Sequence, residues 1–240
     1  MNLYKPLFSI VFLFFILFIA PFSLVAQQVN PLAIVETENG VASEETFQSG
    51  ESFSGSAPMR IRFEAGLQDV PAGMSSHCDW QFYMDPVESS FLNRYEEETT
   101  FNFDVSGTYR VVLTVTFTDE DGTQTIVGPS DPLTITVATS KLHVPNAFSP
   151  NGDGINDIFT VTYQSLVKFQ AVVFNRWGKE MYQWDLSTID KGWDGFYHGK
   201  AVADGVYFIV VEAVGSDGVK YSHKGDINVL KGFTDSSTTP

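Results

Sequence analysis

A strict alternation of apolar and polar residues is the feature that most constrains what this chain can fold into. It is clearest from Thr108 to Thr118, where every second residue is apolar: Tyr109, Val111, Leu113, Val115 and Phe117. The positions between them are mostly Thr or Arg. Because successive side chains of a strand point to opposite faces, this segment is predicted to be a strand with one buried and one solvated face.

Similar alternating or apolar segments recur along the chain and predict further strands. In the first half they span 59–63, 78–83 and 133–137, and in the second half 142–148, 157–163, 167–175, 205–214 and 219–230. Clusters of Gly, Asp, Asn, Ser and Pro separate them, and no amphipathic helical period follows residue 26. This pattern is typical of an all-β protein, here two immunoglobulin-like β-sandwich domains in tandem after a cleaved signal peptide.

The first 26 residues have the pattern of a secretory signal peptide. Lys5 provides a positive n-region, Leu7–Ala20 is an almost unbroken apolar run, and cleavage is expected after Ala26. The alternative is an uncleaved membrane anchor. A spanning helix needs about 20 apolar residues, so the run is short for that role.

Acidic residues are concentrated in one half of the chain. From residue 27 to 140 there are 18 Asp or Glu against four Arg, whereas residues 141–240 carry 11 acids against nine Lys or Arg. This asymmetry predicts a boundary near residue 140, with domains at 27–140 and 141–231 and a flexible tail at 232–240. An acidic surface repels nucleic acid and attracts cations, although its simplest role is to keep the protein soluble.

Four segments of the second half carry a family resemblance. In order they read VPNAFSPNGDGINDIF (144–159), FNRWGKEMY (174–182), GWDG (192–195) and ADGVYFIVVEA (203–213), followed by KGDINVLK (224–231). They resemble the gliding-motility-associated C-terminal domain of Bacteroidetes surface proteins, a type B sorting domain of the CHU_C kind. The resemblance implies export by the type IX secretion system to the cell surface or the medium. It also implies two partners, the translocon and a PorP/SprF-type outer-membrane protein.

The first half resembles a PKD domain, which is an immunoglobulin-like sandwich. The resemblance rests on SGSAPMRIRFEA (54–65), Asp79 with Trp80, and FDVSGTYRVVLTVT (103–116), in which Gly107 permits a tight approach to the strand. The family's usual Gly-Asp-Gly after the tryptophan is absent, because residues 81–85 read QFYMD. A generic immunoglobulin-like domain is the alternative.

The loop SPNGDGIND is a candidate calcium site. Ser149, Asn151 and Asp153 stand at positions one, three and five of a calcium-loop pattern, with Asp157 at position nine. Position one is usually Asp, and position twelve is Thr160 instead of Glu. The alternative is a double turn whose side chains bond to their own backbone. No other cofactor is indicated.

Catalytic patterns are weak, and the sequence favours a non-enzymatic protein. Cys78 is the only cysteine, and the adjacent His77 would point to the opposite face of a strand. No HxxH, HExxH or GxSxG pattern and no phosphate-binding glycine loop occurs. Glu96–Glu98 is expected to be a solvated loop. A pair of carboxylates for glycoside hydrolysis is brought together only by the fold, so the sequence alone leaves this possibility open.

Two functions fit these features. The first is a surface protein whose acidic domain is displayed for adhesion or another interaction. The alternative is a glycan-binding module, with Trp80, Tyr83, Phe91 and Tyr95 as candidate stacking residues, each of which also suits a core. Trp177 is expected to cover one end of the second core, and Trp193–Gly195 to form a turn.

Overall fold

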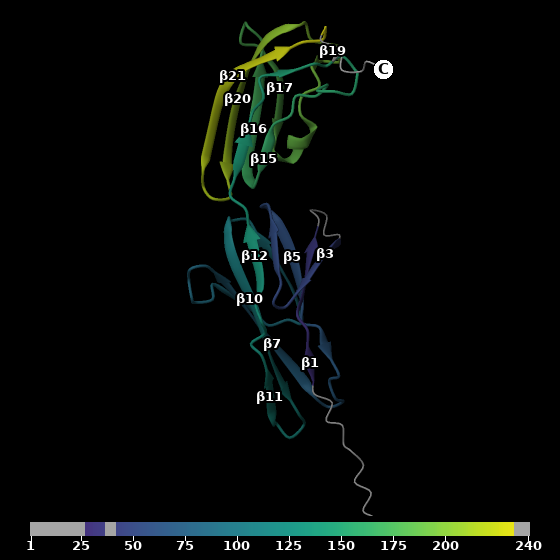
Figure 1. Cartoon of the computed structure of the whole chain (residues 1–240), viewed down its shortest axis with the longest axis vertical. Helices are drawn as coiled ribbons and strands as arrows, with labels where there is room; N and C mark the ends of the chain where they lie inside the picture. Colours follow the sequence, from purple (N-terminus) through teal and green to yellow (C-terminus); the bar gives the residue numbers. More distant parts are fainter. Residues whose placement is uncertain (1–26, 37–41, 233–240) are drawn as a thin grey trace, which may run out of the picture.

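The computed structural model describes residues 27–36 and 42–232, and it is all-β apart from one short helix. The candidate signal peptide and residues 233–240 of the tail lie outside the described residues. Strands gather into two sandwich-like regions, each with its own core, and the two regions are stacked end to end (Figure 1). We refer to them as the N-terminal and C-terminal domains.

The N-terminal domain packs two sheets face to face. One has the order β3 (Ala42–Gln48), β2 (Leu32–Glu36), β5 (Met59–Glu64), β9 (Glu98–Phe103). The other has the order β4 (Ser52–Gly55), β12 (Leu133–Val137), β10 (Gly107–Thr118), β7 (Ser75–Met84), β8 (Leu92–Arg94), with β11 (Gln124–Val127) paired to β10. A small ribbon joins β1 (Gln28–Val29) to β6 (Leu67–Gln68). Only β4 and β12 pair in parallel among these strands.

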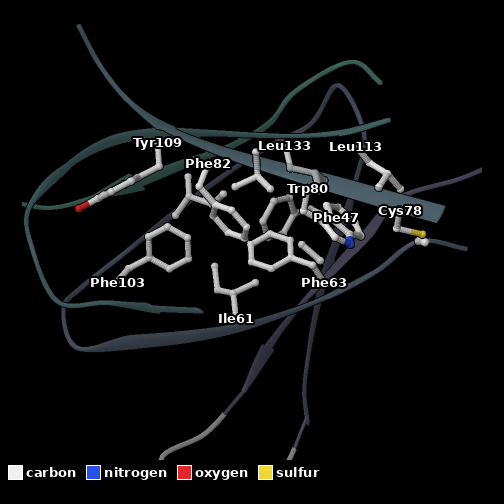
Figure 2. Packing of buried hydrophobic residues seen from close by; sticks show 14 of the residues in the cluster. Phe47, Ile61, Phe63, Cys78, Trp80, Phe82, Phe103, Tyr109, Leu113 and Leu133 are labelled. Carbon is white, nitrogen blue, oxygen red and sulfur yellow. The ribbon is translucent and has the colours of Figure 1, made fainter. Parts of the chain in front are cut away.

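The alternation of β10 is realised as predicted, since all five of its apolar members from Tyr109 to Phe117 are buried. They meet aromatic side chains from the facing sheet, and Figure 2 shows these rings filling the space between the strands. Phe63 is at the centre, with its ring 5.4 Å from that of Phe82 and 5.8 Å from that of Trp80. Close aromatic contacts of this kind add to the free energy of burial.

The C-terminal domain is built on one five-stranded sheet. Its order is β14 (Ala147–Phe148), β21 (Lys220–Val229), β20 (Gly205–Gly215), β16 (Leu166–Phe174), β17 (Glu180–Asp185). Two ribbons, β13 (Lys141–His143) with β15 (Thr162–Gln164) and β18 (Phe196–Tyr197) with β19 (Lys200–Ala201), complete the domain together with the 3₁₀ helix η1 (Leu186–Lys191). The strand expected at 157–163 is not continuous. Phe159 makes an isolated bridge to Trp193, and regular pairing begins only at Thr162.

Ser140 ties the short connection between the domains to the C-terminal domain. Its backbone N–H donates to Asp217 Oδ2 at 3.0 Å, and its hydroxyl donates to Asp217 Oδ1 at 2.7 Å. The same hydroxyl lies 2.8 Å from the Tyr221 hydroxyl. The hydrogen bonds from Ser140 lower the pKa of Asp217, so the carboxylate stays charged and keeps accepting them well into acid.

Further hydrogen bonds join the two domains directly. Ser165, which is only 1% exposed, accepts a hydrogen bond from the Ala57 N–H at 3.2 Å. The Ser106 N–H donates to the Ser216 carbonyl at 3.2 Å, and the two hydroxyls are also bonded. The end of the C-terminal domain that carries the β20–β21 hairpin is therefore covered by the N-terminal domain. We call this the proximal end.

Candidate functional site

Segments far apart in the sequence meet at the opposite end of the C-terminal domain. This distal end, at the top of Figure 1, comprises the loop 149–157, the turn 175–178, the segment 192–204 and the end of β21. The Val202 N–H donates to the Gly195 carbonyl at 2.9 Å, and a Cβ on Gly195 would lie 2.9 Å from Pro150. The Lys231 ammonium reaches the Val202 carbonyl. These contacts join three of the segments, and Lys179, next to the turn, lies against the Tyr197 ring of segment 192–204.

Trp193 is the side chain around which the distal end is assembled. It is fully buried, with its ring 5.3 Å from Phe148 and 5.5 Å from Tyr207. Its indole N–H donates to the Phe196 carbonyl at 3.1 Å, and its backbone exchanges two hydrogen bonds with Phe159. The expected turn at 193–195 is present, since Asp194 Oδ1 accepts from the Phe196 N–H. Trp193 therefore joins three chain segments in one core.

The loop 149–157 is closed by its own side chains. The Asp157 carboxylate accepts hydrogen bonds from the backbone N–H groups of Asn151, Gly152 and Gly154 at 3.0, 2.7 and 2.7 Å. Asp153 Oδ1 in turn accepts from the Ile155 N–H at 2.8 Å. These hydrogen bonds, chiefly those from the two glycines, lower the pKa of Asp157.

The four candidate calcium ligands lie in this one loop, but their oxygen atoms are engaged within it. Ser149 donates its hydroxyl to the Ile155 carbonyl, and Asn151 Oδ1 accepts from the Asp153 N–H. Within residues 27–36 and 42–232, no group of three or more His, Cys, Asp or Glu side chains is placed to hold a metal ion. This geometry matches the double-turn alternative. Calcium binding stays a prediction, which heat on titration to millimolar calcium would support and its absence would remove.

Replacing Asp157 with alanine is expected to release the backbone amides of Gly152 and Gly154 to solvent. Their hydrogen exchange should accelerate markedly, while Asp153→Ala, which removes a different acceptor, should leave these two amides protected. Because the folded-state pKa of Asp157 is lowered, its contribution is complete above the ordinary carboxyl pKa and is lost as the pH falls through the folded value. Equal protection in both variants would contradict this account.

Trp177 does not cover the core, which corrects the sequence-based expectation. Its side chain is 75% exposed. The turn that carries it is fixed by Asn175, whose side-chain oxygen accepts from the N–H groups of Trp177 and Lys179, both at 3.0 Å. The Arg176 guanidinium lies over the indole, 4.3 Å from the ring centroid. The core end that Trp177 was expected to cover is filled by Trp193 instead.

Other apolar and cationic side chains surround this turn. Lys179 lies 4.7 Å from the centroid of the Tyr197 ring. On the outer face of the sheet, Phe174 is directly opposite Phe208 across β16 and β20. Phe208 is 47% exposed, so among the described residues this face carries exposed apolar surface. The domain's exposed large apolar side chains other than Val219 belong to segments at or next to the distal end: Ile155, Ile158, Trp177, Phe196, Val206, Phe208 and Leu230.

In each domain, a tyrosine near the start of the longest strand bonds back to the backbone. Gly107 has φ +155° and the Tyr109 hydroxyl donates to the Val105 carbonyl at 2.8 Å. In the C-terminal domain the Tyr207 hydroxyl donates to the Ala203 carbonyl at 3.0 Å. A tyrosine that bonds back to the backbone four residues earlier is a tyrosine corner, a feature of immunoglobulin-like sandwiches. Both Gly-x-Tyr motifs were visible in the sequence.

The candidate glycan-stacking residues of the N-terminal domain divide by burial. Trp80 is fully buried, with its indole N–H donating to the Glu96 carbonyl at 3.0 Å, so it belongs to the core. Phe91 is 49% exposed but packs edge-on against Phe82. Tyr95 is 56% exposed and stacks on His77, with 5.5 Å between ring centroids.

Tyr83, the fourth candidate, is half-buried on the outer face of β7 in a ladder of polar side chains. Its hydroxyl donates to Gln81, Gln81 donates to Asp79 at 3.0 Å, and Asn93 donates to the same carboxylate at 3.1 Å. Sequence reasoning missed this ladder. The sequence did show a polar residue at every second position of 79–83, but this alternation was interpreted only as a strand and not as a ladder of bonded side chains.

Cys78 is a core residue without the properties of a nucleophile. It is 1% exposed, and its neighbour His77 points to the solvent side of β7, as expected. Burial, with a smaller effect from Glu97, raises the pKa of the thiol to about 11. The thiol is therefore protonated at neutral pH. Glu96–Glu98 are all exposed, but Glu98 begins β9 and lies 3.4 Å from Arg62.

A family match decides the nature of the C-terminal domain. Residues 142–229 match the family described as the CHU_C type IX secretion signal domain. The C-terminal domain is a type IX secretion signal domain. The match supports export by the type IX secretion system to the cell surface or the extracellular space. Among the described residues, no helix combines the length and the apolar character needed to cross a membrane.

Several chains in solved structures are similar to this one. Fibronectin(III)-like modules of CbhA from Clostridium thermocellum are 17% identical, with 76% of this chain and 90% of that chain covered and a TM-score of 0.21. Chicken CNTN1 FN1–FN3 domains are 11% identical, with coverage of 82% and 76% and a TM-score of 0.23. Dimeric latent PorU from Porphyromonas gingivalis is 11% identical, with coverage of 85% and 20% and a TM-score of 0.25. No curated protein matches the chain.

Proposed function

We propose that this is a non-enzymatic protein that the signal domain delivers across the outer membrane, where the PKD-like N-terminal domain is displayed for adhesion or another interaction. The observation that carries this proposal is the match of residues 142–229 to a secretion signal, in a domain whose core is separate from that of the preceding domain. The translocon and a PorP/SprF-type outer-membrane protein are the partners of the signal domain. The N-terminal domain is the part delivered.

The chemistry of the N-terminal domain supports a binding role. Two titratable residues of its core, Cys78 and Tyr109, have their pKa raised by burial, which keeps both protonated at neutral pH. Its charged residues are mainly at the surface, where Arg60 and Arg62 pair with Glu36 at 2.7 and 3.1 Å. Ion pairs and ladders of half-buried polar side chains on the sheet faces suit recognition better than a reaction centre.

Removing residues 141–240 is expected to leave the protein in the periplasm, because the segment that the export system reads is absent. The measurement is protease accessibility on intact cells compared with the periplasmic fraction, for the truncated and the full-length chain. The cut falls within the connection between the domains, so the core of the N-terminal domain is kept. A truncated chain that still reaches the surface would refute the proposal.

A glycan ligand is the second candidate for the N-terminal domain. It is favoured by the ladder of Asp79, Gln81, Tyr83 and Asn93 on an open sheet face, with the exposed ring of Tyr95 on the same domain. Sugar hydroxyl groups suit such amide and carboxylate groups, and sugar rings stack on aromatic side chains. A glycan array probed with the whole secreted chain and its Tyr95→Ala variant distinguishes this ligand class from a protein ligand.

A further inference from the structure

The N-terminal domain leaves only part of the signal domain free for recognition. At the proximal end, Ser165 and Ser216 are 1% and 6% exposed and bond to the N-terminal domain. Among the described residues, the hydrogen bonds from the N-terminal domain reach only the proximal end, and the distal end lies at the far side of the domain from it (Figure 1). The distal end and the outer face of the five-stranded sheet are therefore available to a partner that reads the folded signal domain while the preceding domain is attached.

We propose that Trp177 and Arg176 form the anchor by which a protein of the export machinery holds the signal domain, through an apolar socket edged by carboxylates. This inference rests on the proposed function and names the surface that carries it. Trp and Arg are the residue types that most often dominate the free energy of protein–protein binding. Here the two are adjacent and stacked, with the indole three-quarters exposed.

The turn 175–178 holds the Trp177 indole in solvent, where 75% of the side chain is exposed and little of it packs on the core. Asn175 fixes the turn at both sides, by accepting from Trp177 and Lys179 and by donating to the Lys179 carbonyl at 2.9 Å. Gly178 has φ +75°, which a glycine adopts without strain. A side chain held on a rigid turn loses less conformational entropy on binding than one on a mobile loop.

Apolar surface continues from the turn onto the open sheet face. Val206 and Phe208 lie on the outer face of β20 and are 48% and 47% exposed. Beside them on β16, Phe174 and Val172 are directly opposite Phe208 and Val210. Contiguous exposed apolar surface on a soluble domain commonly marks a binding site. The socket would cover this patch around the central Trp177.

Charge favours a partner with carboxylates. Arg176, Lys179 and Lys200 on the turn and the neighbouring ribbon balance Glu180, Asp194 and Asp204 in the same region, so this surface is close to neutral, whereas residues 27–140 carry 18 acids against four Arg. An acidic rim on the partner would pair with Arg176 and repel the N-terminal domain. Opposed charges of this kind orient two proteins as they approach. The distal end would then meet the partner first, with the delivered domain directed away.

The test uses full-length chains expressed in the native host with Trp177→Ala, Trp177→Phe or Arg176→Glu. The readout is the ratio of surface-exposed to periplasmic protein, and thermal melting of the purified chains checks folding. The ratio is expected to fall about tenfold or more for Trp177→Ala and Arg176→Glu, and much less for Trp177→Phe. Ile126→Ala is the matched control, because Ile126 is 64% exposed but belongs to the N-terminal domain. It is expected to keep the wild-type ratio.

A folded Trp177→Ala chain exported as well as the wild type would overturn the inference. If the chain lacking residues 141–240 is retained at the same time, the proposed function stands and only the anchor is wrong. Binding of the purified chain to vesicles of phosphatidylethanolamine and phosphatidylglycerol, lost in Trp177→Ala, would assign the anchor to lipid and also overturn the protein socket. No vesicle binding is the expected result.

Discussion

Replacing Trp193 with alanine is expected to unfold the signal domain and to abolish export. The side chain is fully buried between Phe148 and Tyr207, and it also donates a hydrogen bond to the Phe196 carbonyl. Truncating a buried tryptophan costs about 3–5 kcal/mol, which is a large share of the ~5–15 kcal/mol that stabilises a typical domain. The measurements are urea unfolding of the purified chain and surface delivery in cells.

Two further variants show whether the destabilisation is specific to the loss of the buried Trp193 ring. Trp193→Phe keeps most of the buried ring and should destabilise the signal domain less. Trp177→Ala removes an exposed indole and should change the free energy of unfolding by no more than about 0.5 kcal/mol. If Trp193→Ala left both the unfolding transition and export unchanged, the assembly of the distal end around Trp193 would be wrong.

Replacing Trp80 with alanine is expected to destabilise the N-terminal domain strongly and to leave the stability of the signal domain unchanged. Trp80 is fully buried against Phe63, and its indole N–H is bonded to the Glu96 carbonyl. The expected loss is again about 3–5 kcal/mol. The two domains have separate apolar cores, and the described contacts between them are mainly hydrogen bonds that involve serine residues. Their unfolding transitions should therefore be separable.

The measurement is urea unfolding followed by amide hydrogen exchange in each domain. In Trp80→Ala, amides of β10 should lose protection at low urea while amides of β20 keep theirs. Val112→Ala, a change on the half-exposed face of β10, is the control and should shift neither transition strongly. Equal loss of protection in both domains would show that the two cores unfold as one unit, contrary to the division proposed here.

Much of the fold followed from the sequence because alternation identifies the buried face of a strand directly. The strand predicted at 108–118 is β10 with one residue added, the strand at 133–137 has the predicted bounds, and the strand predicted at 205–214 extends to Gly215. The edge strand at 180–185 was missed because EMYQWD does not alternate cleanly. Helix η1 was also missed, since it is held by the Asp185 cap and a single buried side chain, Ile189.

The candidate site was less predictable, because it depends on which segments meet in space. The sequence placed the four motifs in order but could not show that they converge at one end of the domain. It also could not distinguish the two tryptophans. Trp177 and Trp193 each stand beside a turn glycine, yet one is 75% exposed and the other fully buried. That difference arises from Phe148, Phe159 and Tyr207, which lie far away in the sequence but enclose only Trp193.

Transfer of the signal domain to an unrelated protein tests whether residues 141–240 are sufficient for export. A fluorescent reporter is placed behind a signal peptide and ahead of residues 141–240, and it is expressed in the native host. Reporter accessible to protease on intact cells is the predicted result, with the same fusion carrying Trp193→Ala retained in the periplasm. A reporter that stays in the periplasm with an intact, folded signal domain would contradict the account.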